Sequence, residues 1–170
     1  MTNFRNLPNF LTIFRMTLSV LSVFMLLSGW LTLWVWFFIV ALVLDVVDGA
    51  LARKLQATSD FGTQLDSFAD FIAFGFVPTV FIFVQRHHDM NFAYPLSVFL
   101  VAGVIRLSLY NTRFSDSKSF QGVPIPLAAL LLVLSQWFGS LLLMIVIAVL
   151  ALAMVAPVRI PSLKGFFDGK

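Results

Sequence analysis

Long apolar runs separated by short polar stretches dominate this chain. Residues 16–44 and 119–158 carry no charged side chain. A membrane-spanning helix needs about 20 apolar residues, so the second run, 40 residues long, is sufficient for two crossings with a glycine-containing turn at 137–140 between them. The whole pattern predicts an all-α integral membrane protein with six transmembrane helices. We expect them near residues 8–27, 30–52, 62–84, 92–110, 124–137 and 140–156.

The composition supports this class. Hydrophobic residues make up 60% of the 170 residues, and the mean hydropathy is +0.98, whereas apolar residues form roughly half of a soluble domain. The chain contains no cysteine, which excludes disulfides and thiol chemistry. Neither a repeat nor a linker is visible, so we expect residues 1–170 to form a single membrane domain.

The positive charges indicate an orientation in the membrane. If the N-terminus is cytoplasmic, all of the 11 Lys and Arg residues except Arg86 fall on the cytoplasmic side of the predicted spans. Cytoplasmic loops of membrane proteins carry this excess of positive charge. The sequence therefore predicts a multi-pass protein of the cell membrane with both termini in the cytoplasm. The high isoelectric point therefore reflects this topology and contact with anionic headgroups, and no nucleic-acid partner is needed to explain it.

Four aspartates interrupt the apolar pattern where lipid should exclude charge. Asp45 and Asp48 are three residues apart near the end of the second predicted span, and Asp66 and Asp70 are four apart in the third. Residues at these spacings share a helix face, and the short connection makes the two spans antiparallel neighbours. The four carboxylates, called the aspartate cluster below, should therefore converge just inside the membrane boundary. Ionisable groups at such depth usually face a cavity or a partner.

A divalent cation is the partner that carboxylates suggest. Carboxylate oxygens suit Mg²⁺, Mn²⁺ or Ca²⁺, and four of them can hold one ion or two; a pair of ions clamps the oxygens of a phosphoryl transfer. Gly49 and Gly62 would let a ligand approach the backbone closely, and Arg53 offers a planar donor fork for a phosphate. The alternative interpretation is that the aspartates cap helices and neutralise Arg53 and Lys54 at the interface.

A divalent-cation carrier is the rival function outside enzymes, because carboxylates inside membranes often mark ion paths. The acids gather at one side of the predicted bundle only. The outer halves of the spans offer no second polar cluster that would complete a path. The sequence therefore favours a site for chemistry over a path for ions.

The same stretch resembles the CDP-alcohol phosphotransferase family. The family motif is D-x-x-D-G-x-x-A-R, eight residues, then G-x-x-x-D-x-x-x-D. All of its spacings are kept here, at Asp45, Asp48, Gly49, Ala52, Arg53, Gly62, Asp66 and Asp70. The resemblance implies six transmembrane helices in a homodimer, with a cytoplasm-facing polar cavity. It also implies a reaction in which an alcohol attacks the lipid-side phosphorus of a CDP-linked lipid and CMP leaves.

The resemblance assigns roles to the motif. The aspartate cluster would hold two Mg²⁺ or Mn²⁺ ions, and Asp70 would also act as the general base near the incoming hydroxyl. The donor lipid would lie against four further motif residues, Gly49, Ala52, Arg53 and Gly62.

The first predicted span opens with a second similarity. Pro8, Asn9, Thr12 and Arg15 match the P-N-x-x-T-x-x-R opening of many relatives. Asn9 and Thr12 lie one turn apart and would reach the cytidine of the CDP-lipid. The alternative interpretation is a helix start with proline near its first position and with Arg15 extending to the interface.

The acceptor is indicated by the residues around Asp66 and Asp70. Relatives that use glycerol phosphate generally have proline and lysine where this chain has Ser67 and Phe71, so the stretch resembles the branch that transfers a phosphatidyl group from CDP-diacylglycerol to L-serine. An arginine would clamp the serine carboxylate. The candidates for the acceptor site all lie between residues 105 and 113: Arg106, Arg113 and Asn111.

Some positions depart from that branch. Ala73, Val77 and Leu109 replace its usual serine, alanine and arginine. These differences leave open another acceptor, such as glycerol 3-phosphate or inositol phosphate, or an archaeal ether-lipid donor. Arg106 and Arg113 are alternatively ordinary positive-inside residues.

Overall fold

The computed structural model describes residues 7–54, 59–109, 120–156 and 159–160. The chain forms two compact units, Met1–Asp89 and Met90–Lys170, and each is described by itself. The expectation of a single domain over residues 1–170 stays a prediction.

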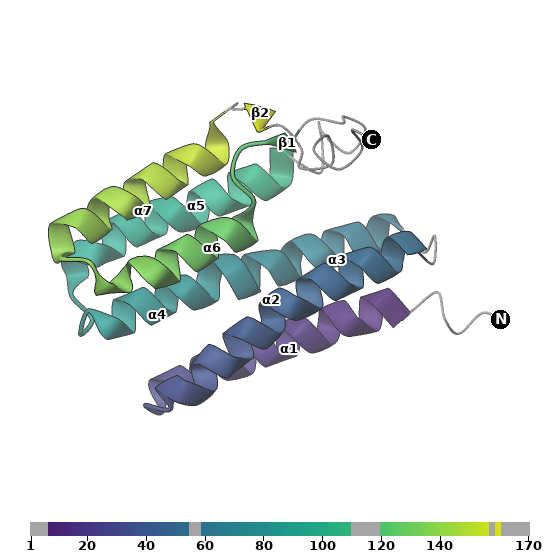
Figure 1. The fold of residues 1–170 in the computed structure, drawn as a ribbon, viewed down its shortest axis with the longest axis horizontal. Helices are drawn as coiled ribbons and strands as arrows, with labels where there is room; N and C mark the ends of the chain where they lie inside the picture. Colours follow the sequence, from purple (N-terminus) through teal and green to yellow (C-terminus); the bar gives the residue numbers. More distant parts are fainter. Residues whose placement is uncertain (1–6, 55–58, 110–119, 157–158, 161–170) are drawn as a thin grey trace, which may run out of the picture. The chain divides into compact units, whose positions relative to one another are not determined.

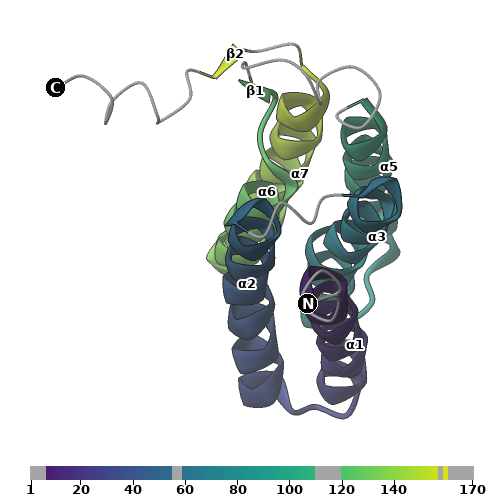
Figure 2. The same cartoon turned by 90° about the vertical axis from the view of Figure 1, so that its right-hand side faces the viewer.

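The first unit is built from helices (Figure 1). Its elements are α1 (Leu7–Leu27), α2 (Leu31–Lys54), α3 (Asp60–Asp70), the π-helix η2 (Phe71–Phe76) and α4 (Val77–Gln85). A tight turn joins α1 to α2, as Figure 2 shows. Gly29 has a positive φ of 81° there, which glycine adopts without steric cost. Helix α1 then contacts α2, α3, η2 and α4, so it lies at the centre of the unit.

The inward face of α1 is polar. Its buried residues follow helical spacing of three and four along the whole element: Pro8, Thr12, Arg15, Ser19, Ser22 and Leu26. The outward face carries large apolar side chains such as Phe10 and Phe24. Small residues at helix interfaces let helices approach closely in lipid, where apolar groups gain little by leaving the bilayer. Helix α1 therefore packs its polar face against the other helices of the unit and leaves its large apolar side chains on the outside.

Helix α3 continues through η2 into α4 as one helical segment. Its start is capped by Ser59, whose hydroxyl accepts a hydrogen bond from the Gly62 N–H at 3.0 Å. The wider turn of η2 is consistent with Pro78, because proline has no N–H to donate to the carbonyl four residues earlier. At its end the Val77 N–H bonds to the Ile72 carbonyl, five residues back. Such π segments frequently occur at functional sites, and this one begins directly after Asp70.

Aromatic rings form the apolar core of the first unit. Trp34 of α2 stacks on Phe81 of α4 with ring centroids 4.0 Å apart and on Phe38 at 5.4 Å. Phe38 meets Phe74 of η2 edge to face at 6.5 Å. The guanidinium carbon of Arg15 then lies 5.6 Å from the centroid of the Phe74 ring. A continuous column of rings therefore links the core to the polar stripe of α1.

The second unit contains η3 (Met90–Phe92), α5 (Ala93–Leu109), β1 (Phe120–Gln121), α6 (Ile125–Leu134), η5 (Ser135–Trp137), α7 (Ser140–Val155) and β2 (Arg159–Ile160). Helix α7 packs on both α5 and α6, and β1 pairs antiparallel with β2. Gly122 has φ +77°, and a Cβ there would lie 2.5 Å from the Met154 carbonyl oxygen. Glycine is therefore needed where the chain turns from β1 toward α6, which begins after Pro124.

The all-α prediction is confirmed, apart from the two-residue strands. Within the described residues, four segments are long and apolar enough to cross a membrane: Leu7–Leu27, Leu31–Leu51, Asp60–Gln85 and Met90–Leu109. Two shorter apolar helices, Ile125–Trp137 and Ser140–Val155, coincide with the fifth and sixth predicted spans. Six helical segments thus match the prediction within a few residues at each end, whereas the cytoplasm-facing cavity stays a prediction.

The ring column yields a test of stability. We expect Trp34→Ala to lower the free energy of unfolding by on the order of 3 kcal/mol, because it removes a buried ring and leaves a cavity. Trp36→Ala is the matched control, since Trp36 lies two residues away on the same helix and is 61% exposed. The measurement is the temperature at which each detergent-solubilised variant loses its monodisperse chromatography peak. An equal decrease in this temperature for the two variants would contradict the assignment of Trp34 to the core.

Candidate active site

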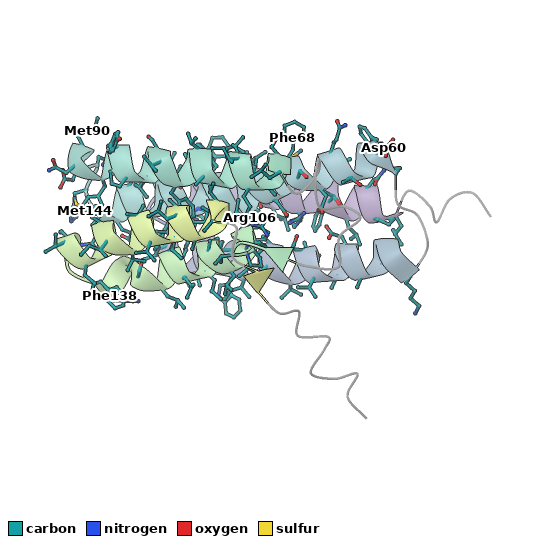
Figure 3. All side chains as sticks on the ribbon, turned by 90° about the horizontal axis from the view of Figure 1, so that it is seen from above. Asp60, Phe68, Met90, Arg106, Phe138 and Met144 are labelled. Atoms are coloured by element: carbon teal, nitrogen blue, oxygen red, sulfur yellow. The ribbon has the colours of Figure 1, made fainter. Side chains whose placement is uncertain are left out.

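The aspartate cluster comes together in the first unit, as the sequence predicts. Helix α2 supplies Asp45 and Asp48, and α3 supplies Asp66 and Asp70. Asp45, Asp48 and Asp66 each offer a carboxylate oxygen, and these oxygens all lie within 4.8 Å of one another. Between the two aspartates of α3, Phe68 points to the outer edge of the helix (Figure 3) and is 65% exposed. The acids therefore share the inner face of their helix.

Arg15 of α1 lies among all four carboxylates. Its Nη1 donates to Asp45 Oδ1 at 2.6 Å and to Asp70 Oδ1 at 2.7 Å. Its Nη2 donates to Asp66 Oδ1 at 2.7 Å, and its Nε lies 3.4 Å from Asp48 Oδ2. Charge-assisted bonds of this length are among the stronger hydrogen bonds in proteins. One side chain of α1 thus connects α2 to α3.

Exposure varies across the site. The Arg15 side chain is fully buried, that of Asp48 is 4% exposed, and that of Asp66 is 48% exposed. The cluster is therefore closed on the side of α1 and accessible at Asp66. An ion or a polar substrate would enter from that side.

Thr12 orients one of the carboxylates. It is buried, one helical turn before Arg15, and its hydroxyl lies 3.0 Å from the Pro8 carbonyl oxygen and 3.3 Å from Asp48 Oδ2. A hydroxyl has a single proton, so it donates to one of these oxygens at a time. Thr12 therefore contacts the carboxylate that is most deeply buried.

Gly62 permits a close approach between α3 and α1. A Cβ at this position would lie 2.8 Å from Asn9 Oδ1 and 3.1 Å from Ser59 Oγ. Any larger residue must displace the Asn9 side chain, which the sequence assigns to the cytidine. The absence of a side chain at Gly62 thus serves the packing of Asn9, and its predicted role toward the donor lipid stays a prediction.

The residues present fit a divalent cation. The donor set is entirely carboxylate oxygen, which hard cations such as Mg²⁺ and Mn²⁺ prefer. The same carboxylates converge on a positive charge, the Arg15 guanidinium, in the structure itself. The aspartate cluster can therefore hold a metal ion.

The other predicted site residues differ in what the structure describes. Gly49 follows Asp48 in α2. The side chains of Ala52 and Arg53, and all of Asn111 and Arg113, lie outside the described residues. Arg106 is buried in the last turn of α5 in the second unit (Figure 3). The role of Arg106 at the acceptor site stays a prediction.

Sequence reasoning missed the central position of Arg15. The alternative that this side chain extends to the interface is wrong, because the four aspartates hold it in a fully buried position. A signal was present, since Arg15 is the only charged residue of its span and shares a helix face with Thr12, Ser19 and Ser22. The π-helix after Asp70 was also missed, and Pro78 was its only sequence signal.

Comparison with known proteins agrees with the site. The model of the CDP-alcohol phosphatidyltransferase family matches residues 5–158. The chain is 34% identical over 161 residues to the CDP-diacylglycerol–serine O-phosphatidyltransferase of Bacillus subtilis, an alignment that covers 93% of this chain and 91% of the relative. It is 33% identical over 171 residues to the enzyme of the same name from Helicobacter pylori, covering 92% and 72% respectively. The archaetidylserine synthase of Methanothermobacter thermautotrophicus is 28% identical over 175 residues, covering 96% and 73%.

These matches show the family. The chain belongs to the CDP-alcohol phosphatidyltransferases and is a phosphotransferase enzyme of the membrane. The aspartate cluster lies within the matched residues.

The contact of Thr12 with Asp48 can be tested. We expect Thr12→Val to weaken Mn²⁺ binding about tenfold, the lower end of the effect of losing a hydrogen bond to a metal ligand. Thr17→Val is the matched control, because the Thr17 hydroxyl also donates to a backbone carbonyl of α1, that of Ile13 at 2.9 Å, but from an exposed position. Free Mn²⁺ is measured by electron paramagnetic resonance during titration of each purified variant. Equal affinities for the two variants would show that Thr12 does not support a metal ligand.

Proposed function

We propose that this enzyme transfers a phosphatidyl group from CDP-diacylglycerol to the hydroxyl of L-serine, releasing CMP and forming phosphatidylserine. The observation that carries the proposal is the convergence of the four aspartates from α2 and α3 at one site. The printed names of the relatives from Bacillus subtilis and Helicobacter pylori support serine as the acceptor. The resemblance at Ser67 and Phe71, which stand where glycerol-phosphate users generally have proline and lysine, points to the same acceptor.

The aspartate cluster would hold two Mg²⁺ or Mn²⁺ ions. When bound, they would neutralise charge on the diphosphate of the donor and on its leaving phosphate. Asp48 is well suited to a fixed ligand because it is buried and contacts Thr12. Asp66 is suited to the open side, where its exposed carboxylate can receive an ion from water.

Asp70 is the proposed general base. It ends α3, its side chain is 17% exposed, and it contacts the guanidinium of Arg15. The serine oxygen would form a bond to the lipid-side phosphorus while its proton passes to the Asp70 carboxylate. The bond between that phosphorus and the bridging oxygen would break, and its electron pair would leave with CMP. A positioned carboxylate of this kind accelerates proton transfer typically by 10²–10⁴-fold.

The remaining motif residues would hold the donor lipid. Asn9 and Thr12 lie on α1 beside the start of α3 and the end of α2, respectively. We assign them to the cytidine end of the donor. The diphosphate would lie against four motif residues, Gly49, Ala52, Arg53 and Gly62.

The acceptor site belongs to the proposal as well. A serine carboxylate needs a cationic clamp, and Arg106 is our first candidate for it. Asn111 and Arg113 are the further candidates from the same part of the sequence. The protein would act as a homodimer in the cell membrane with both termini in the cytoplasm, where serine is available.

A second candidate differs only in the donor lipid. The similarity to an archaetidylserine synthase over 96% of this chain favours an ether-lipid donor as the alternative to CDP-diacylglycerol. Other acceptors, such as glycerol 3-phosphate or inositol phosphate, remain the alternatives for the alcohol. Membership of an enzyme family weighs against the divalent-cation carrier.

Acceptor specificity gives the first functional test. We expect purified protein in detergent, with Mg²⁺ or Mn²⁺ and CDP-diacylglycerol, to release CMP when L-serine is added and to stop when a chelator removes the metal. Glycerol 3-phosphate, inositol and inositol phosphate are tested in parallel with both donor types. Release with one of these alcohols in place of serine would overturn the acceptor, and release only from a CDP-linked ether lipid would overturn the donor.

The role of Asp70 gives a second test. We expect Asp70→Asn to reduce turnover by at least about 10²-fold, as loss of a general base does, while binding of the CDP-lipid changes little. Asp60→Asn is the matched control, because Asp60 is an exposed carboxylate in the first turn of the same helix (Figure 3). CMP release and binding of radiolabelled CDP-lipid are measured for both variants. Full turnover by Asp70→Asn would rule out Asp70 as the general base.

A further inference from the structure

The Arg15 guanidinium occupies the space between the carboxylates that would bind the metal. Its three nitrogens contact different carboxylates: Nη1 that of Asp45, Nε that of Asp48 and Nη2 that of Asp66. These three aspartates are the ones whose oxygens lie within 4.8 Å of one another. The Arg15 guanidinium therefore occupies the position that a divalent ion bound to these three carboxylates would take.

Geometry makes the two cations exclude each other. Oxygen ligands lie 2.0–2.6 Å from Mg²⁺ or Ca²⁺, so an ion shared by these three carboxylates lies inside their triangle of oxygens. The Arg15 nitrogens lie 2.6 and 2.7 Å from Asp45 Oδ1 and Asp66 Oδ1. An ion bound to those atoms would approach the guanidinium closely, and like charges at about 4 Å repel strongly where water is scarce.

Charge balance indicates which cation is the stronger partner. Arg15 supplies one positive charge to four carboxylates, so the cluster keeps a net negative charge when all are ionised. A divalent ion compensates more of that charge in a smaller volume than a guanidinium does. The side chain also has a second contact that uses no carboxylate, the face of the Phe74 ring at 5.6 Å, which attracts a cation by itself.

We propose that Arg15 is a resident counter-cation of the aspartate cluster, which holds the four carboxylates together before metal binds and is displaced from them by the divalent ion. The inference rests on the metal-binding part of the proposed function and does not depend on the acceptor. In the metal-free protein Arg15 joins α1, α2 and α3. In the metal-bound protein the ion takes over that role, and the apparent metal affinity is reduced by the competition.

Metal titration without lipid or serine tests the proposal. We expect Arg15→Gln to bind Mn²⁺ at least about tenfold more tightly than the wild type, within the usual range for coupled binding equilibria. We expect Arg15→Lys to lie between them, because an ammonium keeps the charge but lacks the planar fork. Arg86→Gln is the control for loss of a positive charge, since Arg86 follows α4 and has no part in the cluster. Unchanged or weaker Mn²⁺ binding in both Arg15 variants would overturn the proposal.

Thermal stability gives a readout that does not depend on affinity alone. In chelator, Arg15→Gln should lose its chromatography peak at a lower temperature than wild type, because four carboxylates are left without their cation. Saturating Mn²⁺ should remove most of that difference, so the metal-induced shift is larger in the variant. If Arg15→Gln does not fold in chelator, Arg15→Lys carries the same comparison. A variant that stays equally destabilised with Mn²⁺ would show that Arg15 has a purely structural role, which contradicts the proposal.

A competition experiment separates displacement from an indirect effect on folding. In Arg15→Ala purified with Mn²⁺, added ethylguanidinium should weaken Mn²⁺ binding competitively, whereas wild-type affinity should not change. Absence of this effect would overturn the proposal. Failure of every variant and of the wild type to bind Mn²⁺ would overturn the metal site in the proposed function as well. A wrong acceptor would leave all of these measurements unaffected.

Discussion

The ion pairs between Arg15 and the four carboxylates are the constraint on which the first unit depends. Charged groups away from water need partners, since desolvation costs each of them several kcal/mol. A single guanidinium contacts carboxylates from two other helices at 2.6 to 3.4 Å, so it fixes α2 and α3 around α1. It cannot neutralise all of them, however. When all four carboxylates are ionised, the cluster keeps a net negative charge, which suits it to a divalent cation. The side chain that joins the three helices therefore does not complete the charge balance of the site.

The rest of the unit follows from that arrangement. Helix α1 must present Arg15 inward, so its buried face carries threonine and serines while its phenylalanines face outward. The apolar core is displaced to the rings of α2 and α4, and the column that begins at Phe81 ends at Phe74, beneath the guanidinium. The π-helix supplies Phe74 and starts where α3 ends at Asp70. Core, polar stripe and candidate site are therefore one continuous packing arrangement.

The sequence predicts much of this structure, for identifiable reasons. Helix positions follow from apolar runs of bilayer length, and the convergence of the aspartates follows from helical spacing and a short connection, because both are local properties. The position of Arg15 could not be predicted with the same certainty. An arginine in a membrane-spanning helix can extend to water or pair with acids on other helices. Only the tertiary contacts decide between these two arrangements. The π-helix escapes sequence reasoning for a similar reason, since a single proline is compatible with several local geometries.

The burial of the cluster bears on the proposed chemistry. A CDP-linked lipid carries its diphosphate at the level of the headgroups, whereas serine arrives from water. Asp45 and Asp48 lie six or more residues before the end of α2, and Asp66 and Asp70 lie in the first half of the helical segment that runs to Gln85. All four are therefore inside helices and not in the connection between them. In open water, the charges of the site would be screened and weaker. In the proposed reaction, a site that is buried at Asp48 and open at Asp66 would let both substrates reach the same carboxylates, while burial strengthens the charge interactions between them.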